Sequence, residues 1–186
     1  MPYRARLRPK YTDDQLHEIY AKPHNHTRWH DHHIRVDTTI ATAHWMHVPQ
    51  TSVADLSCGD AAIANALAPN ASRVYLGDYA PGYEYHGAIE ETLSKIPRVG
   101  TFICSETLEH LDNPDAVLAA IRQKADRLIL STPIYEEESV GNLEHYWGWS
   151  CETIEEMLKI AGWRPTVLNR LELRDYTYDF QIWGCG

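Results

Sequence analysis

The chain has 186 residues, of which 44% are hydrophobic and 23% charged, and its formal net charge is −9. This size and mix suit one soluble domain with a substantial core and leave little room for two. No apolar run approaches the roughly 20 residues that span a bilayer, and no apolar stretch follows the basic start to make a signal peptide. The sequence therefore predicts a single cytoplasmic domain over residues 1–186, with no membrane as partner.

Charge and cysteine content narrow the classes of partner and site. Residues 1–50 carry 7 Lys/Arg against 5 Asp/Glu, whereas residues 51–186 carry 10 against 21. An acidic body repels a phosphate backbone, which disfavours long nucleic acid as a partner. The four cysteines form no CxxC pair and lie far apart, so they indicate neither a zinc knuckle nor a disulfide framework.

The first predicted element is an amphipathic helix over residues 28–46, in a region rich in histidine. His26, His30 and His33 are spaced by 4 and 3 residues, so on a helix they share one face. Three imidazoles on one face are able to bind a divalent ion. The spacing matches no established metal motif such as H-E-x-x-H, so we predict that this helix covers a ligand pocket and that no metal binds.

Short β-rich runs then alternate with helical stretches. The predicted strands are VADL, RVYLG, TFICS and RLILSTP, and the predicted helices are DAAIANALA, PDAVLAAIRQKA and ETIEEMLKIAG. This alternation indicates βαβ units, and hence an α/β fold with a mostly parallel sheet covered by helices on both faces.

Helix ends and a final pair of strands complete the pattern. Asn113 before Pro114 is typical of a helix start, and Gly162 is typical of a helix end. After Gly162, two β-rich runs are separated by only Arg174 and Asp175. They predict an antiparallel hairpin that closes the sheet.

The stretch VADLSCGDAAI predicts a strand, a tight turn and a helix whose first backbone N–H groups face a ligand. The next strand ends in Asp78, which follows Asp55 by 23 residues. In dinucleotide-binding folds, an acidic residue about 20 residues after the glycine-rich turn holds the ribose hydroxyls. The spacing therefore predicts recognition of adenosine.

The turn itself argues against a dinucleotide. Gly59 is the one glycine left of a G-x-G-x-G pattern, because Ser57 and Ala61 take the other two places. Close approach of a pyrophosphate to the backbone needs those glycines. An adenosine ligand with an amino-acid tail in place of phosphates does not, which points to S-adenosylmethionine.

The order of the segments resembles the class I S-adenosylmethionine-dependent methyltransferases over roughly residues 28–186. VADLSCGDAAI is similar to their first motif, VYLGDYA to the second, and TFICSETLEHLDNPDAVL to the segment of the fourth strand. STPIYEEE resembles the fifth strand and its loop, and NLEHYWGWSCETIEEMLKIAGW resembles the aromatic segment and helix that follow. The resemblance implies a Rossmann-like sheet of seven strands with an antiparallel last strand, methyltransferase activity and S-adenosylmethionine as cofactor.

The resemblance also implies a set of cofactor contacts. Around the methionine half it places Asp55, Ser57, Cys58, Gly59 and Asp60. Ser105 and Glu106 would lie near the ammonium and sulfonium groups, and Arg28 or His33 would contact the carboxylate or close the site.

For the adenosine half, the resemblance implies that Asp78 binds the ribose hydroxyls and that Tyr79 packs on the adenine. Ala88 stands where relatives often have an acid that binds the adenine amino group, and Ile89 follows it. A backbone group, a nearby polar side chain or apolar contact with Ile89 would then recognise the base.

Methyl transfer from a sulfonium is an in-line displacement, so it needs alignment, and a base only when the acceptor has a proton to lose. We predict His145 as the base if its pKa is near neutral; it could equally anchor its loop to the neighbouring tryptophans. Tyr20, Tyr146 and Glu136 are candidate substrate-binding residues.

The fourth-strand segment lacks the N/D-P-P-Y/F motif of nucleic-acid N-methylating enzymes. Cys104 also lacks the preceding proline of a cytosine C5 nucleophile. We therefore predict a small-molecule acceptor. Three alternatives stay open: a non-catalytic module that binds the cofactor or S-adenosylhomocysteine, a methyltransferase acting on nucleic acid or protein, and a His-rich metal-dependent enzyme. Within the domain, residues 1–50 are predicted as a helical lid and 51–186 as the cofactor-binding core.

Overall fold

The computed structural model describes residues 2–20, 28, 30–137, 143–173 and 179–186. Its strands are β1 (Arg4–Arg6), β2 (Val53–Asp55), β3 (Val74–Asp78), β4 (Tyr85–His86), β5 (Val99–Ser105), β6 (Ala125–Ile134), β7 (Trp147–Trp149), β8 (Pro165–Leu171) and β9 (Asp179–Cys185). Its α-helices are α1 (Asp13–Tyr20), α2 (His30–Met46), α3 (Ala62–Leu67), α4 (Ile89–Thr92), α5 (Pro114–Lys124) and α6 (Cys151–Ile160). Short 3-10 helices follow at η2 (Ala68–Asn70), η3 (Leu93–Lys95) and η4 (Leu108–His110).

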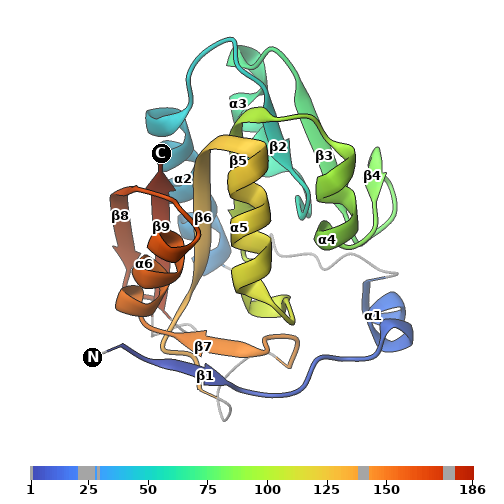
Figure 1. Cartoon of the computed structure of the whole chain (residues 1–186), viewed down its shortest axis with the longest axis vertical. Coiled ribbons are helices and arrows are strands. Elements are labelled where there is room, and N and C mark those ends of the chain that lie inside the picture. The colour runs from blue at the N-terminus through green and yellow to red at the C-terminus, as the bar shows by residue number, and fades with distance from the viewer. Residues whose placement is uncertain (1, 21–27, 29, 138–142, 174–178) are drawn as a thin grey trace.

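A sheet of seven strands forms the centre of the molecule, in the order β4-β3-β2-β5-β6-β9-β8 (Figure 1). The pairs from β4 to β6 are parallel, while β9 runs antiparallel to both β6 and β8. Strand order reverses between β2 and β5, where open α/β sheets bind their ligands. The predicted Rossmann-like sheet with an antiparallel last strand is confirmed.

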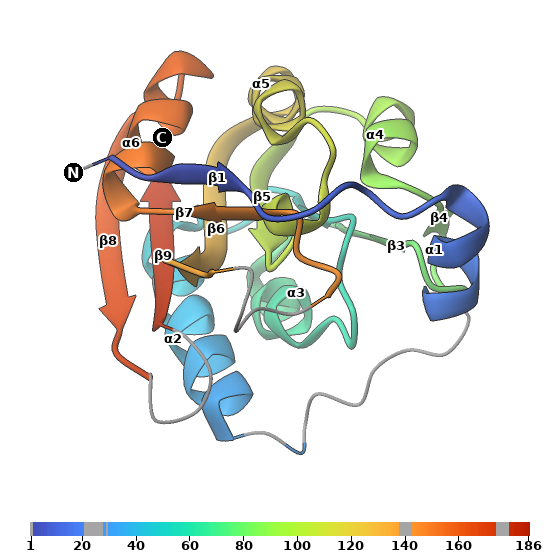
Figure 2. The ribbon, with the colours of Figure 1, turned by 90° about the horizontal axis from the view of Figure 1, so that it is seen from below.

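Helices cover both faces of the sheet, as predicted. Figure 2 shows α4, α5 and α6 on one face and α2 and α3 on the other. Side chains alternate along β5: Phe102 and Cys104 pack into the core under α5 and α6, whereas Ile103 joins the core under α2 and α3. Both cores are apolar, and this rigid sheet positions the loops at the carboxyl ends of its strands.

Helix ends form where the sequence predicts them. The Asn113 side chain accepts a hydrogen bond from the Ala116 N–H over 3.1 Å, with Pro114 as the first residue of α5. Gly162 adopts a φ of +86° just after α6, which favours glycine because it has no Cβ.

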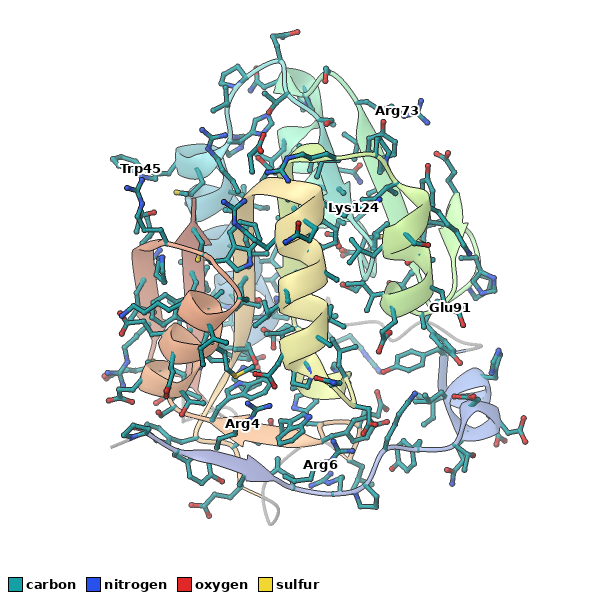
Figure 3. The ribbon with its side chains drawn as sticks, viewed as in Figure 1. Arg4, Arg6, Trp45, Arg73, Glu91 and Lys124 are labelled. Carbon is teal, nitrogen blue, oxygen red and sulfur yellow. The ribbon has the colours of Figure 1, made fainter. Side chains whose placement is uncertain are left out.

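Residues 2–20, here named the strap, run beneath the carboxyl ends of the strands (Figures 1 and 2). β1 pairs antiparallel with β7, so that Arg4 lies opposite Trp149. Figure 3 shows Arg4 and Arg6 on the strap, and their guanidinium carbons lie 4.7 and 4.8 Å from the Trp147 ring centroid. The predicted lid thus contains a paired strand, and its lid function stays a prediction.

The last two strands form the predicted antiparallel pair, with Leu171 opposite Phe180. Arg174 and Asp175, predicted as the turn, lie outside the described residues, and Glu172 already follows the end of β8. No helix in the described ranges combines the length and apolar character needed to cross a membrane.

Candidate functional site

The turn after β2 is closed onto the end of β3. The backbone N–H of Gly59 donates to Asp78 Oδ2 over 2.8 Å, and the N–H of Ala80 donates to Oδ1 over 2.8 Å. Gly59 adopts a φ of +53°, and its carbonyl accepts from the Tyr83 hydroxyl over 2.6 Å. An ionised carboxylate has about four acceptor positions. Asp78 is therefore fixed by backbone groups and keeps acceptor capacity for the hydroxyls of a ligand.

Asp55, at the end of β2, is buried beneath the same turn. Burial raises its pKa to about 8, and the nearby Asp78 and Asp60 carboxylates act in the same direction. The Ser57 N–H opposes them by donating to Asp55 Oδ1 over 3.4 Å. Asp55 therefore holds its proton near neutral pH until a cation, such as an ammonium group, lies beside it.

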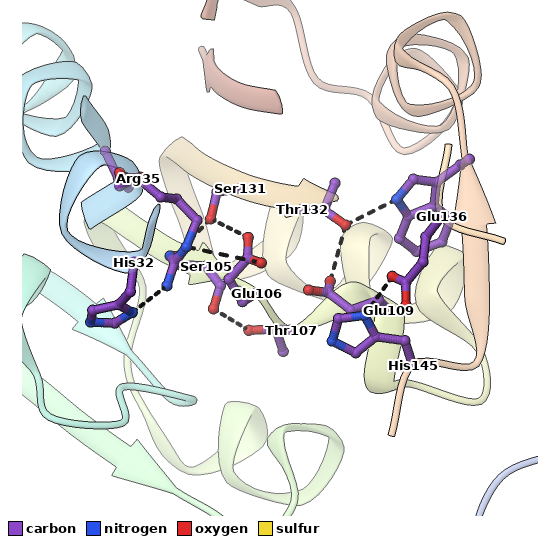
Figure 4. Close-up of polar contacts among 12 residues, drawn as sticks. His32, Arg35, Ser105, Glu106, Thr107, Glu109, Ser131, Thr132, Glu136 and His145 are labelled. Carbon is purple, nitrogen blue, oxygen red and sulfur yellow. Dashed lines mark hydrogen bonds and ion pairs between the residues drawn. The ribbon is translucent and has the colours of Figure 1, made fainter. Parts of the chain in front are cut away.

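A buried arginine lies next to the end of β5, in a group named the Arg35 cluster and shown at the left of Figure 4. The Arg35 guanidinium donates from Nη1 to Ser105 Oγ over 3.0 Å, and its Nε lies 4.0 Å from Glu106 Oε2. Ser131 Oγ lies 2.8 Å from Ser105 Oγ and donates to Glu106 Oε1 over 2.9 Å. Helix α2 thus delivers a cation to the carboxyl ends of β5 and β6.

Glu106 combines an unfavourable backbone conformation with a partly buried carboxylate. Its φ of +51° is unusual for a residue with a side chain, and such residues cluster at functional sites. Burial raises the pKa of the carboxyl group, and the Arg35 charge opposes that shift.

A second buried group, named the Glu109 cluster, lies at the right of Figure 4. Glu109 Oε2 accepts from Thr132 Oγ1 over 3.0 Å, and Thr132 Oγ1 accepts from the Trp149 indole N–H over 2.9 Å. Beside them, His145 Nδ1 lies 2.5 Å from Glu136 Oε2. Glu109 follows β5, Thr132 lies in β6 and Trp149 ends β7, while Glu136 and His145 lie between β6 and β7. Three segments of the sequence therefore meet here.

The environment of His145 differs from the one predicted for a base. Its side chain is buried, and burial lowers its pKa to about 3, although the Glu136 carboxylate favours the charged ring. Burial is the larger effect, so the imidazole is neutral at neutral pH and donates from Nδ1 to Glu136. Such a ring is a weak base, and Glu136 is a buried partner of the ring rather than part of a solvated loop.

Of the two predicted substrate-binding tyrosines, Tyr20 belongs to the strap and Tyr146 contacts it. Tyr20 packs 5.4 Å from the Tyr79 ring, and burial, with the nearby Glu144, Tyr146 and Asp78, raises the pKa of its hydroxyl. Tyr146 is buried, and its hydroxyl accepts from the Tyr11 N–H over 3.2 Å. The strap therefore contacts both Tyr79, which follows β3, and Tyr146, which precedes β7.

The structure brings most of the predicted cofactor residues to the carboxyl edge of β2, β3 and β5. Cys58 is buried in the turn, and exposed Asp60 accepts from the Ala62 N–H over 3.0 Å. Ala88 precedes α4 and Ile89 begins it, with Ile89 buried.

Arg28 and His33 are exposed, whereas Arg35 on the same helix is buried at the edge of the site. Sequence reasoning did not single out Arg35, Thr107 or Glu109. Thr107 Oγ1 lies 2.6 Å from Ser57 Oγ and joins the two loops.

No protein-family model matches the sequence, and no curated protein matches it either. Solved structures do match. Magnesium protoporphyrin IX methyltransferase (ChlM) from Synechocystis PCC 6803, crystallised with bound SAH, is 19% identical, with 92% of this chain and 93% of that chain covered and a TM-score of 0.65. The 1,6-didemethyltoxoflavin-N1-methyltransferase of Burkholderia thailandensis is 14% identical, with 100% and 95% covered and a TM-score of 0.64.

A third neighbour carries the name of a different reaction. Precorrin 8W decarboxylase of Methanobacterium thermoautotrophicum is 16% identical, with 81% of this chain and 89% of that chain covered and a TM-score of 0.55. At these identities the likeness concerns the fold. The chain has the fold of the class I S-adenosylmethionine-dependent methyltransferases.

Proposed function

We propose that this chain is an S-adenosylmethionine-dependent methyltransferase that acts on a small molecule. One observation carries the proposal: the Asp78 carboxylate, at the end of β3, accepts from the Gly59 N–H of the turn after β2 and from the Ala80 N–H, next to the point between β2 and β5 where the strand order reverses. In this fold that position suits recognition of ribose hydroxyls. Similar folds named as methyltransferases of Mg-protoporphyrin IX and of 1,6-didemethyltoxoflavin support a small-molecule acceptor.

In this proposal the cofactor lies across the carboxyl ends of β2, β3 and β5. Asp78 binds the ribose, while Tyr79 and Ile89 pack on the adenine, and Ala88 contributes backbone. The ammonium group lies near Asp55, whose raised pKa falls when a cation pairs with it. Arg35 binds the carboxylate of the methionine half, since it is the buried cation nearest the Ser105 edge.

The acceptor occupies the side of the Glu109 cluster, with Tyr20, Tyr146 and His145 around it. Its lone pair forms a bond to the methyl carbon while the carbon–sulfur bond breaks, and the sulfonium becomes the neutral thioether of S-adenosylhomocysteine. Any proton on the acceptor atom leaves to solvent or to a nearby base. Most of the rate enhancement then comes from alignment in a pocket that excludes water.

Calorimetric titration with S-adenosylmethionine and S-adenosylhomocysteine tests the cofactor site. Micromolar binding is expected for the unmodified protein, with a loss of at least about tenfold in Asp78→Ala because a charge-assisted hydrogen bond to a buried ligand is lost. Asp126→Ala is the matched control, since Asp126 is exposed at the start of β6, where it pairs with Arg98. No binding to the unmodified protein, or equal affinities in both variants, contradicts the proposal.

Turnover separates an enzyme from a non-catalytic binding module. The protein is incubated with S-adenosylmethionine and a panel of small hydroxyl- and amine-bearing aromatic acceptors, and S-adenosylhomocysteine is quantified. Product formation that needs an acceptor supports methyl transfer. Tight cofactor binding without product from any acceptor, including RNA and peptide pools, favours a sensor or partner subunit.

A further inference from the structure

Three side chains of the kind that bind metals meet in the Glu109 cluster. One carboxylate oxygen of Glu109 and one ring nitrogen each of His110 and His145 all lie within 4.8 Å of one another. Glu109 and His110 belong to η4, directly after β5, and His145 precedes β7. None of them belongs to the histidine-rich region from which a metal site was first considered.

Of the three residues, Glu109 has the surroundings that most favour a bound cation. Its side chain is fully buried, and Oε1 has no hydrogen-bond partner among the described residues, while Oε2 accepts from Thr132. A buried carboxylate with an unpartnered oxygen is destabilising unless a charge or donor compensates it.

Both histidines are oriented in the manner of metal ligands. His145 Nδ1 lies 2.5 Å from a carboxylate oxygen of Glu136, and His110 Nδ1 lies 3.0 Å from the Glu144 carbonyl oxygen. Ligand histidines commonly donate one ring N–H to a carboxylate or a backbone carbonyl, which fixes the ring and its tautomer. The two rings stand 4.6 Å apart between centroids, and one nitrogen of each lies within 4.8 Å of a Glu109 carboxylate oxygen.

We propose that Glu109, His110 and His145 bind one divalent transition-metal cation, with Glu136 as a positioning residue for His145. Two imidazole nitrogens and one carboxylate oxygen suit Zn²⁺, Co²⁺ or Mn²⁺, whereas Mg²⁺ and Ca²⁺ favour sites built from oxygen alone. Metal–ligand bonds of about 2.0–2.2 Å bring ligand atoms to about 3–4 Å from one another.

The role of the ion rests on the proposed function, whereas its binding does not. Three protein ligands leave coordination positions for water or for an oxygen or nitrogen atom of the methyl acceptor. A cation there holds the acceptor and lowers the pKa of its hydroxyl or amine. The ion would thereby assist loss of the acceptor's proton, while His145 stays buried with its Nδ1 held by Glu136.

The test uses the full chain, freed of metal by a chelator and then dialysed. ZnCl2 is titrated by calorimetry, and CoCl2 by visible absorption, with no S-adenosylmethionine present. One equivalent of each ion is expected to bind, and MgCl2 is expected to give no saturable signal. Glu109→Gln and the half-exposed His110→Asn each weaken binding by roughly 100-fold, and Glu136→Gln by roughly 10- to 100-fold, as expected for an outer partner.

The matched control is His26→Ala/His30→Ala/His33→Ala, which removes the predicted histidine face and is expected to retain full affinity. Loss of binding in that variant but not in folded Glu109→Gln or His110→Asn overturns the proposal, as does the absence of Zn²⁺ binding. Circular dichroism establishes that each variant is folded. A separate S-adenosylmethionine titration keeps the two proposals apart: cofactor binding without metal refutes this inference alone, and metal binding without cofactor refutes the proposed function alone.

Discussion

The Arg35 guanidinium donates to Ser105 Oγ over 3.0 Å and approaches Glu106 to 4.0 Å, which joins α2 to the carboxyl end of β5. Arg35 is buried and Glu106 is partly buried, so the guanidinium compensates a carboxylate that has limited access to water. Stability and ligand binding therefore meet in one side chain.

Arg35→Ala is expected to reduce the free energy of unfolding by about 2–4 kcal/mol, because Glu106 and the Ser105 hydroxyl lose their cationic partner. Urea unfolding measures the change. Arg73→Ala is the matched control: its ion pair with Glu84 is exposed, so the loss should stay below about 1 kcal/mol. Equal losses in the two variants would show that the Arg35 cluster contributes no more than a surface pair.

Asp55 makes the stability of the ligand-free protein depend on pH. Its pKa is about 8 in the folded chain and near 3.8 when unfolded, so the folded state holds an extra proton between these values. The free energy of unfolding therefore has its full contribution from Asp55 below pH 4. That contribution falls as the pH rises towards 8, by up to about 5 kcal/mol. Asp55→Asn should flatten this part of the stability curve, as measured by urea unfolding at pH 5, 6.5 and 8. If the free energy of unfolding of Asp55→Asn depends on pH as steeply as that of the unmodified protein, other groups cause the pH dependence.

Gly59→Ala is expected to cost about 1–2 kcal/mol, because a φ of +53° disfavours any residue with a Cβ. An added Cβ meets no atom within 4 Å, so the effect comes from backbone strain rather than from a clash. Gly162→Ala, at a φ of +86°, is the control for strain remote from the turn. Both variants should lose thermal stability, and Gly59→Ala alone should also bind S-adenosylmethionine more weakly. Equal cofactor affinities would place the ligand elsewhere.

The thiols are expected to react slowly in the native protein. Burial raises the pKa of Cys58, Cys104, Cys151 and Cys185, the last to about 12, so the thiolate is scarce at pH 8. Cys151 is the least buried and should be labelled first by a disulfide reagent. Cys151→Ser should remove that first phase, and unfolding in urea should expose all remaining thiols. A fast phase that persists in Cys151→Ser contradicts this order.

Local patterns in the sequence were sufficient for much of the sheet. The alternation of β-rich and helical runs predicted β2, β3, β5 and β6. β2, β5 and most of β6 are buried on both faces and read as continuous apolar runs, whereas β3 is mostly half-buried. The spacing from Asp55 to Asp78 placed both acids at one edge, since parallel strands end together. Cap residues marked α5 and α6 because their hydrogen bonds are local.

The residues that sequence reasoning missed depend on contacts between distant segments. Helix α2 buries a polar stripe, including Arg35 and Thr39, so its apolar periodicity did not reveal which face turns inward. A signal was present, since Arg35 is the one basic side chain, apart from histidine, inside that helix. No local pattern distinguished Glu109, because its burial depends on Thr132, which donates to its carboxylate, and on Tyr146, whose N–H donates to its carbonyl.

The pairing of Arg4 with Trp149 also affects the order in which the parts of the protein fold during synthesis. Ribosomes add about 5–20 residues per second, so the first strand leaves the exit tunnel roughly ten seconds before its partner exists. During that interval β2, β3 and β5 already have both of their sheet neighbours, whereas β1 has no strand to pair with. The small sheet of β1 and β7, on the side proposed for the methyl acceptor, consequently forms after the parallel strands β2 to β5 are able to pair.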